Sequence, residues 1–458
     1  MNNNYREEAD SIGIRKIPID AYYGVQSLRA SENFKITGKR VHPEFIKGMA
    51  EVKMAAAIAN NKVGVIEKKI SDAIVKASQE ILEGKFIDNF IVDPIQGGAG
   101  TSLNMNANEV IANRAIEILG ETKGNYKIVH PNDHVNCGQS TNDAYPSAGK
   151  LATIRLLQNN ILALNNLHIA FLKKAEEFKD ILKMGRTEMQ DAVPISFGQV
   201  FNSFASVISR DIRRFEEAIK VMSVLNMGGT AVGTGINADK EYIKIIVPEL
   251  AEVTNLSLTQ SEDLVDGTQN LDCFVYVSGI IKTCASNLSK IANDLRLMSS
   301  GPRAGFNEIN LPAKQNGSSI MPGKINPVIP EVVSEIAFNI IGNDTTITLA
   351  AQSGQLELNA FEPIIFYCLF ESLDTLCNGI NTFTNECIID ITINEEKCKN
   401  DIERNVGIIT AFCPYIGYTE AARIAKRALK ENKSIREILT EENINLDIDK
   451  ILNPKNMI

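Results

Sequence analysis

Residues 271–298 read LDCFVYVSGIIKTCASNLSKIANDLRLM, and their apolar positions recur every three or four residues. The recurring positions are Phe274, Val277, Ile281, Cys284, Ala285, Leu288, Ile291 and Leu295. Such a stripe predicts a helix that buries one face against neighbouring helices. Similar helical patterns occur at residues 143–177, 192–224, 331–350 and 355–387. Because little strand pattern separates them, they predict a mainly α fold with a central bundle of five long helices.

Smaller parts are predicted on either side of the bundle, because 458 residues are many for one hydrophobic core. Residues 1–141 begin with an arm of mixed, partly extended pattern up to residue 43 and continue with helices, one of them at residues 68–82. The bundle takes residues 142–393. Shorter helical patterns at residues 394–458 predict a small C-terminal domain. We therefore expect three domains.

Composition excludes several classes of partner. The formal charge of −9 and the pI near 5.3 argue against nucleic acid and against an anionic membrane surface. The sequence contains no run of eighteen or more apolar residues, so no membrane span is predicted, and the first residues lack the apolar core of a signal peptide. The eight cysteines contain no CxxC pair, which favours reduced thiols over a zinc site. We expect a cytoplasmic protein.

A polar loop follows the 271–298 helix. Residues 317–331 read GSSIMPGKINPVIPE, where two glycines permit hinge motion or positive φ and three prolines stiffen the chain. Ser318 is a poor base unless its oxyanion is stabilised, and Lys324 and the loop's own N–H groups could supply that stabilisation. We expect a lid, residues 317–326, that closes over a carboxylate. The alternative is an ordinary solvated connection.

Three further polar stretches stand before predicted helices: residues 97–106, 139–143 and 183–191. A helix start offers unpaired N–H groups and the positive end of the helix dipole, which suits a carboxylate. Taken singly, each stretch could be a plain helix cap. The glycine-rich residues 228–235 lack the lysine and hydroxyl ending of a nucleotide-binding loop, so no nucleotide site is expected.

These stretches together resemble the aspartase/fumarase superfamily. The resemblance rests on GSSIMPGKIN (317–326), GGAGTSLNMN (97–106), HPNDHVNCGQSTND (130–143) and KMGRTEMQDAVPI (183–195), and it extends over nearly the whole chain. It implies a homotetramer with a twenty-helix core, in which each active site takes segments from three subunits. The runs NPVIPEVV (326–333), IGNDTTIT (341–348) and GQLELN (354–359) look more like the aspartate ammonia-lyase branch than the fumarases.

The resemblance implies a reaction and its residues. It implies that L-aspartate is reversibly deaminated to fumarate and ammonia, after Ser318, with its oxyanion stabilised by Lys324, removes the Cβ proton and an aci-carboxylate forms. Each donor that meets the new charge would be worth roughly 3 kcal/mol. The substrate-binding residues that the resemblance implies are Thr101, Ser140, Thr141 and Ser319 for the β-carboxylate, Thr187 and Asn326 with Lys324 for the α-carboxylate, Asn142 with Thr101 for the amino group, and Glu188. No cofactor is required, and a divalent cation is expected only as an activator.

Glu188 departs from the family pattern, in which fumarases and some aspartases carry histidine and other aspartases carry glutamine. A carboxylate there repels a substrate carboxylate unless it is protonated, and it attracts an ammonium group. It could also turn outward, or share a proton with Glu331, its expected partner. The alternatives therefore include a fumarate hydratase, an ammonia-lyase for another amino acid, and a non-catalytic structural homologue. For His130 and His134 we expect a structural or regulatory role.

Overall fold

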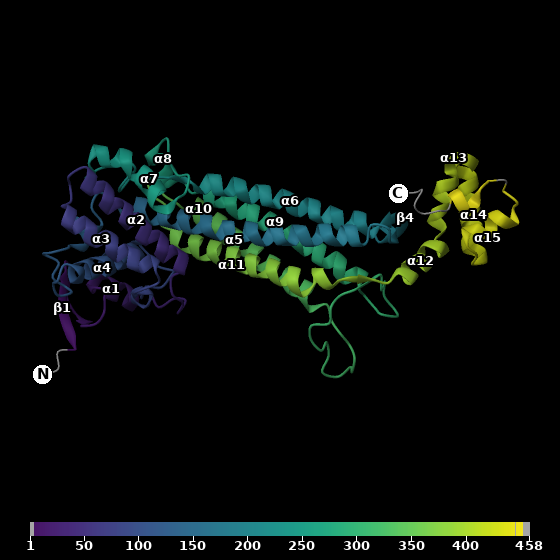
Figure 1. Ribbon diagram of the computed structural model, residues 1–458, viewed down its shortest axis with the longest axis horizontal. Helices are drawn as coiled ribbons and strands as arrows, with labels where there is room; N and C mark the ends of the chain where they lie inside the picture. The colour runs from purple at the N-terminus through teal and green to yellow at the C-terminus, as the bar shows by residue number, and fades with distance from the viewer. Residues whose placement is uncertain (1–3, 445, 452–458) are drawn as a thin grey trace. The chain divides into compact units, whose positions relative to one another are not determined.

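The computed structural model describes residues 4–444 and 446–451, and most of them are helical (Figure 1). The helices in these residues are α1 (Val25–Asn33), α2 (Pro43–Lys62), α3 (Lys68–Leu82), α4 (Thr101–Ile118), α5 (Thr141–Glu177), α6 (Phe197–Met222), α7 (Lys240–Thr254), α8 (Leu264–Gln269), α9 (Asp272–Met298), α10 (Val328–Gln352), α11 (Glu362–Glu386), α12 (Glu395–Arg404), α13 (Cys413–Ile416), α14 (Tyr418–Glu431), α15 (Ile435–Glu441) and α16 (Ile448–Ile451). The predicted mainly α fold is confirmed.

The strands of the described residues are short, and each pairs with one other strand. They are β1 (Tyr5–Asp10) with β2 (Gly13–Pro18), β3 (Leu182–Thr187) with β4 (Gln190–Ser196), β5 (Val224–Leu225) with β6 (Thr259–Gln260), and β7 (Ile309–Asn310) with β8 (Thr392–Ile393). The β5–β6 pair is parallel and the others are antiparallel. Within residues 4–444 and 446–451, no helix has the length and apolarity that a membrane crossing needs.

The chain divides by contacts into two compact units. Unit 1 comprises Met1–Ile161, Arg213–Thr283 and Asn339–Thr375, and unit 2 comprises Leu162–Ile212, Cys284–Phe338 and Leu376–Ile458. Each of the five long helices α5, α6, α9, α10 and α11 contributes one segment to each unit. The expected division into three domains, at residues 141 and 393, stays a prediction.

Aromatic and aliphatic side chains bury the helix faces within each unit. In unit 1, the rings of Phe274 on α9 and Phe366 on α11 lie 5.0 Å apart between centroids. In unit 2, Phe171 on α5 packs against Phe204 on α6 at 5.6 Å. The stripe predicted for α9 is buried as expected, since Leu288 is 3% exposed. The five-helix bundle predicted from the spacing is therefore confirmed inside each unit.

The α2 helix begins as the sequence indicates, directly after residue 42. Pro43 occupies its first turn, where a missing N–H costs nothing, and Nδ1 of His42 accepts a hydrogen bond from the Glu44 N–H at 3.1 Å. The α2 helix then packs against α3 and α7, and α3 packs against α4. These contacts fix the position of α4, and with it the polar residues at its start, within unit 1.

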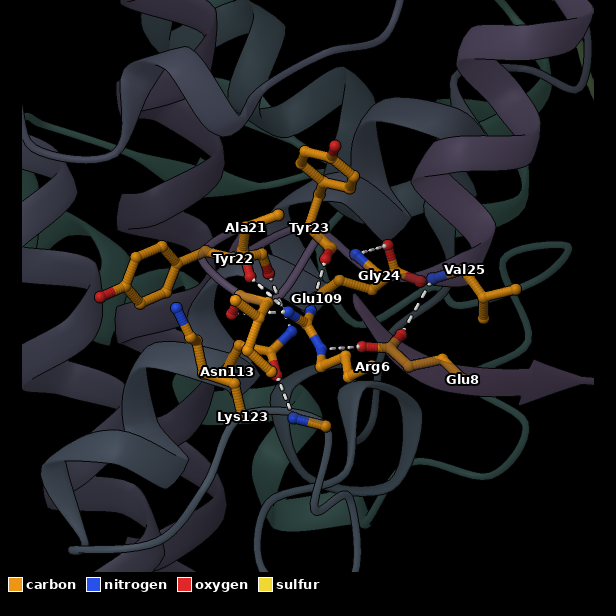
Figure 2. A network of polar contacts seen from close by, with 12 residues as sticks. Arg6, Glu8, Ala21, Tyr22, Tyr23, Gly24, Val25, Glu109, Asn113 and Lys123 are labelled. Atoms are coloured by element: carbon orange, nitrogen blue, oxygen red, sulfur yellow. Dashed lines mark hydrogen bonds and ion pairs between the residues drawn. The ribbon is translucent and has the colours of Figure 1, made fainter. Parts of the chain in front are cut away.

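A buried network fixes the N-terminal hairpin and the start of α1 (Figure 2). The Arg6 guanidinium donates to the carbonyl groups of Pro18, Ala21 and Tyr23 at 2.7–2.9 Å and to Glu8 at 2.8 Å. Its planar fork carries five N–H donors in a fixed geometry and therefore satisfies three carbonyl groups and one carboxylate at once. The hairpin and the loop that follows it are thereby held as one piece.

Glu109 of α4 completes that network by capping α1. Its carboxylate accepts hydrogen bonds from the N–H groups of Gly24, Gln26 and Ser27 at 2.8–3.1 Å and from the Ser27 hydroxyl. A carboxylate satisfies the unpaired N–H groups of a helix start and interacts favourably with its dipole. Burial nevertheless raises the pKa of Glu109 to about 7.

In unit 2, the β3–β4 hairpin packs against the C-terminal helices. Met184 of β3 belongs to one buried cluster with Ile409, Phe412, Ile424 and Leu439. The α12 helix contacts β3, and α14 and α15 pack on each other. This cluster supports the base of the hairpin from which Thr187 and Glu188 project.

Two predicted helices begin later than expected. The pattern at residues 192–224 forms a helix only from Phe197, because residues 190–196 are strand β4 and Pro194 opposes helical structure in the residue before it. The pattern at residues 355–387 forms a helix only from Glu362, since Pro363 favours the first turn of a helix. The arm up to residue 43 contains the short helix α1, which the sequence pattern did not reveal.

Glu362 predicts a pH dependence of stability. Burial raises the pKa of its carboxyl to about 8, against the opposing attraction of Lys150. The native state therefore holds a proton that the unfolded chain loses near its usual pKa, and stability decreases as the pH rises between these two values. We expect Glu362→Gln to remove this slope, so that the variant gains about 1.4 kcal/mol over the parent for each pH unit in that interval.

Urea unfolding at a fixed protein concentration, repeated across the interval, measures this difference. Glu217→Gln, at an exposed position of α6, is the matched control and should keep the parent's slope. A Glu362→Gln variant that runs parallel to the parent at every pH would contradict the assignment.

Candidate active site

Thr101 stands at the first position of α4 and is exposed. The preceding Gly100 has φ 90°, and a Cβ there would lie 2.4 Å from the ring of Tyr145, so only glycine fits. The Thr101 hydroxyl donates to the carbonyl of Gly98 at 2.7 Å. Its lone pairs are then left to accept, which suits an ammonium group better than a carboxylate.

Ser140, Thr141 and Asn142 form the start of α5, above the buried carboxylate of Asp143. Asp143 accepts the Ser140 N–H at 2.9 Å with one oxygen. Its other oxygen accepts N–H groups of the glycine-rich loop, from Gly228 at 3.2 Å and Thr230 at 3.0 Å. Burial raises its pKa to about 6, although these hydrogen bonds lower it. The glycine-rich loop at residues 228–235 thus holds the start of α5 in place.

Asn142 faces the same loop, because its amide donates to the carbonyl of Ala231 at 2.7 Å. The Thr141 hydroxyl oxygen accepts a hydrogen bond from the amide of Asn104 on α4 at 3.1 Å. Asn104 therefore joins the starts of α4 and α5. We call Thr101, Ser140, Thr141 and Asn142 the unit-1 half-site.

A pocket of about 590 Å³ opens beside Thr101, between α1 and α4. Arg29, Tyr126, His130 and Asn132 also line it. Arg29 is paired with Asp10 at 2.8 Å, so part of its charge is already satisfied.

Both histidines of the 130–136 stretch have structural partners. Nδ1 of His130 accepts the N–H groups of Asn132 and Asp133 at 3.2 and 3.1 Å. Nδ1 of His134 accepts the His130 N–H at 2.8 Å, and burial lowers the pKa of His134. These contacts agree with the structural role expected for the pair.

Thr187 and Glu188 lie exposed at the tip of the β3–β4 hairpin. Glu188 and Met189 form its two-residue loop with φ 53° and 67°, the arrangement of a type I′ turn. Asparagine and glycine fit this turn best, so a glutamate and a methionine there are strained. Backbone strain of this kind gathers at functional positions.

The hairpin is anchored by Glu308, whose side chain is fully buried. Arg186 reaches Glu308 with its guanidinium at 2.6 Å, and Lys183 lies 3.1 Å from the other carboxylate oxygen. Arg186 also lies over the ring of Phe306 at 4.4 Å. A buried carboxylate held by two cations keeps the base of the hairpin in place.

Two hydrogen bonds join the two ends of the lid loop. The Gly317 N–H donates to the carbonyl of Lys324 at 2.8 Å, and the Asn326 amide donates to the carbonyl of Gly317 at 2.9 Å. A Cβ at Gly317 would lie 2.7 Å from the Asn326 nitrogen, so glycine is needed for close approach. At Gly323 the reason for glycine is different, because its φ of 80° is a left-handed conformation that favours glycine.

The Ser318 side chain accepts hydrogen bonds from the backbone of the lid itself. Its Oγ accepts the N–H groups of Ile320 at 3.2 Å and Met321 at 2.9 Å. Two N–H donors on a hydroxyl oxygen lower the cost of its negative form. The role of Ser318 as the base stays a prediction. Lys324 is exposed.

The predicted site residues fall into two groups, one in each unit. The unit-2 half-site comprises Thr187, Glu188, Ser318, Ser319, Lys324 and Asn326. Glu331 forms an ion pair with Arg296 of α9 at 3.4 Å, and its pairing with Glu188 stays a prediction. Within residues 4–444 and 446–451, no group of three or more histidine, cysteine, aspartate or glutamate side chains is arranged to hold a metal ion.

The residues that position these groups were not singled out from the sequence. They are Lys53, Asn104, Asp143 and Glu308. A usable signal existed for Lys53, which is the lone charge in the run VKMAAAIA of a buried helix. For Glu308, which lies in a loop, the local pattern carries no such signal.

Comparisons with known proteins assign the family. Residues 13–342 match the family model described as lyase, and residues 408–458 match the one described as the fumarase C C-terminus. An aspartate ammonia-lyase of Bacillus sp. is 53% identical over 463 residues, covering 100% of this chain and 98% of the relative.

Two solved structures are also similar. A fumarate lyase:delta crystallin from Brucella melitensis bound to cobalt has a TM-score of 0.96 and 46% identity, with 99% of both chains covered. A class II fumarase from Schistosoma mansoni has a TM-score of 0.95 and 34% identity, again with 99% of both chains covered. On these matches, which extend over the full length, the chain belongs to the aspartase/fumarase superfamily of lyases.

Proposed function

We propose that this chain is an aspartate ammonia-lyase, which reversibly deaminates L-aspartate to fumarate and ammonia. The arrangement of Ser318 carries the proposal, because two lid N–H groups already stabilise the negative form of its Oγ. The full-length relative that shares 53% of its residues bears that name, whereas the fumarase shares 34%. This difference favours the ammonia-lyase over the hydratase.

The reaction begins at Cβ. The oxyanion form of Ser318 takes the Cβ proton and becomes a hydroxyl, and the electron pair of the broken C–H bond moves into the β-carboxylate to form an aci-carboxylate dianion. The barrier is mainly this added charge, so donors fixed before the reaction are the main source of catalysis. Ser140, Thr141 and Ser319 are the proposed donors.

The second step breaks the bond between Cα and nitrogen. The electron pair of the aci-carboxylate returns to form the carbon–carbon double bond, and the pair of the breaking bond leaves with nitrogen as ammonia. Thr187, Lys324 and Asn326 hold the α-carboxylate throughout. Thr101 suits the amino group, because its hydroxyl hydrogen already goes to Gly98 and its lone pairs remain. This route requires no cofactor, and we assign a divalent cation at most an activating role.

A homotetramer with active sites shared among three subunits is part of the proposal. Apolar side chains stand exposed along two long helices, which supports burial against other copies. On α10 they are Phe338 (64% exposed), Ile341 (41%) and Leu349 (54%), and on α5 they are Leu162 (65%), Ile169 (49%) and Leu172 (42%). Shared sites are also consistent with the division of the predicted residues between the two units.

The substrate is tested directly by following fumarate absorbance with L-aspartate and, separately, with L-malate. We expect turnover of aspartate at a kcat/KM at least about 100-fold above that for malate, because malate offers no ammonium group. Preference for malate would indicate a fumarate hydratase. Turnover of neither compound, nor of any other amino or hydroxy diacid, would indicate a non-catalytic homologue.

Replacement of Ser318 tests the base. We expect Ser318→Ala to lower kcat by about 1,000-fold or more, because the variant loses the hydroxyl oxygen to which the two lid N–H groups donate. Fumarate should still bind the variant, which isothermal titration can measure. Ser203→Ala, an exposed serine of α6, is the control and should retain full activity. Parental kcat in Ser318→Ala would end the assignment.

Replacement of Glu188 tests the departure from the family. The side chain is exposed at the hairpin tip, so we expect Glu188→Gln to leave kcat/KM for aspartate within about threefold of the parent or to raise it. Glu217→Gln is the control for a lost surface charge. A loss of 100-fold or more would show instead that the carboxylate acts on the substrate.

A further inference from the structure

Lys53 of α2 is fully buried, and among the residues that the structure describes no carboxylate makes a hydrogen bond to its ammonium group. Its ammonium group donates to three amide oxygens: Oδ1 of Asn104 at 2.7 Å, Oδ1 of Asn136 at 2.8 Å and Oε1 of Gln139 at 2.8 Å. An ammonium has three donors and no acceptor, so all its hydrogens are used. Burial lowers its pKa to about 7, while the charge of Asp143 raises it. Burying an ammonium group costs free energy unless its hydrogens are satisfied, so the three amide oxygens are needed for Lys53 to remain charged.

The ammonium fixes the orientation of the amides around it. Because Lys53 can only donate, the oxygen of the Asn104 side chain must face it, and the NH₂ group must point the other way. That NH₂ group donates to Oγ1 of Thr141 at 3.1 Å. A reversed amide would present its oxygen to Thr141 and its NH₂ group to Lys53, where two sets of donors would collide.

The same logic extends to the Thr141 hydroxyl. Since its oxygen accepts from Asn104, its hydrogen is directed elsewhere, and the described part of the chain provides no acceptor for it. Thr101 differs, because its hydrogen is already donated to Gly98. One threonine of the unit-1 half-site is thus left as a donor and the other as an acceptor.

We propose that Lys53 is a positioning residue, which acts through Asn104 to keep the Thr141 hydroxyl as a donor to the substrate carboxylate. This rests on the proposed function, in which Thr141 meets the charge of the aci-carboxylate. Lys53 also holds Asn136 and Gln139, which precede Ser140. The amide of Asn136 in turn donates to the carbonyl of Gln139 at 3.1 Å, so the turn that leads into α5 is fixed from the same point.

A double-mutant cycle with Lys53→Met and Thr141→Val tests the connection. Each single variant should lower kcat for aspartate by about 100-fold, the usual cost of one lost donor to a developing oxyanion. In the Thr141→Val background the hydroxyl is absent, so Lys53→Met should cost less than about fivefold more. Losses that multiply to about 10,000-fold, or parental kcat in Lys53→Met, would overturn the proposal.

Asn104→Asp keeps the test valid if Lys53→Met does not fold. The aspartate still accepts from the Lys53 ammonium but cannot donate, so the Thr141 hydroxyl turns to it and is lost to the substrate. We expect a loss of kcat equal to that of Thr141→Val within about threefold, and parental kcat would contradict the proposal. Lys174→Met removes a buried lysine that donates to the Ile391 carbonyl, and as the control it should lower the melting temperature without changing kcat.

The same variants are titrated with succinate, a dicarboxylate that binds without reacting. If the parent does not deaminate aspartate, the proposed function fails, and the cycle in succinate affinity still decides the role of Lys53. Non-additive losses of affinity for Lys53→Met and Thr141→Val support the proposal, and additive losses refute it. If the parent is active but the losses of kcat multiply, the Lys53 proposal alone fails.

Discussion

The carboxylate of Asp143 is the constraint on which the unit-1 half-site depends. It binds the Ser140 N–H on one side and the glycine-rich loop on the other, beneath the start of α5. Moving this turn would leave buried donors unsatisfied, at about 1–3 kcal/mol each. Donors held this firmly need no rearrangement when charge forms on a bound carboxylate, which is the condition for electrostatic catalysis. Lys53 adds direction to that rigidity by setting which way each amide faces.

The unit-2 half-site combines a fixed base with a free tip. Glu308 is buried between Arg186 and Lys183, so the β3 strand cannot shift without separating charges. Thr187 and Glu188 nevertheless lie exposed to solvent, and Ser318 of the lid accepts hydrogen bonds from the lid's own backbone. The base of the hairpin is therefore held in place before a ligand arrives, whereas the tip of the hairpin and the lid are available to move onto the ligand.

Helix spacing and composition were enough to predict the bundle, because a buried stripe with a period of 3.6 residues leaves a clear pattern in α9. Pro194 and Pro363 marked helix boundaries that the pattern alone had missed. The site motifs were visible because hydroxyl, amide and glycine residues gather in short runs. Their supports were not: the pattern around Glu308 says nothing of Arg186, which is distant in sequence and meets it only in the fold. The direction of the Thr141 hydroxyl likewise depends on three side chains from different elements.

The lid exposes the apolar side chains of Ile320 (83%), Met321 (49%) and Ile325 (48%) to water. In the proposed closed state, these side chains leave water together with the substrate, and removal of apolar surface from water gives binding a negative heat-capacity change. The binding enthalpy for a dicarboxylate then changes with temperature more steeply than polar contacts alone would allow. Reopening must hydrate the same side chains again, so part of the barrier to product release lies in the apolar face of the lid and not in the charged groups it covers.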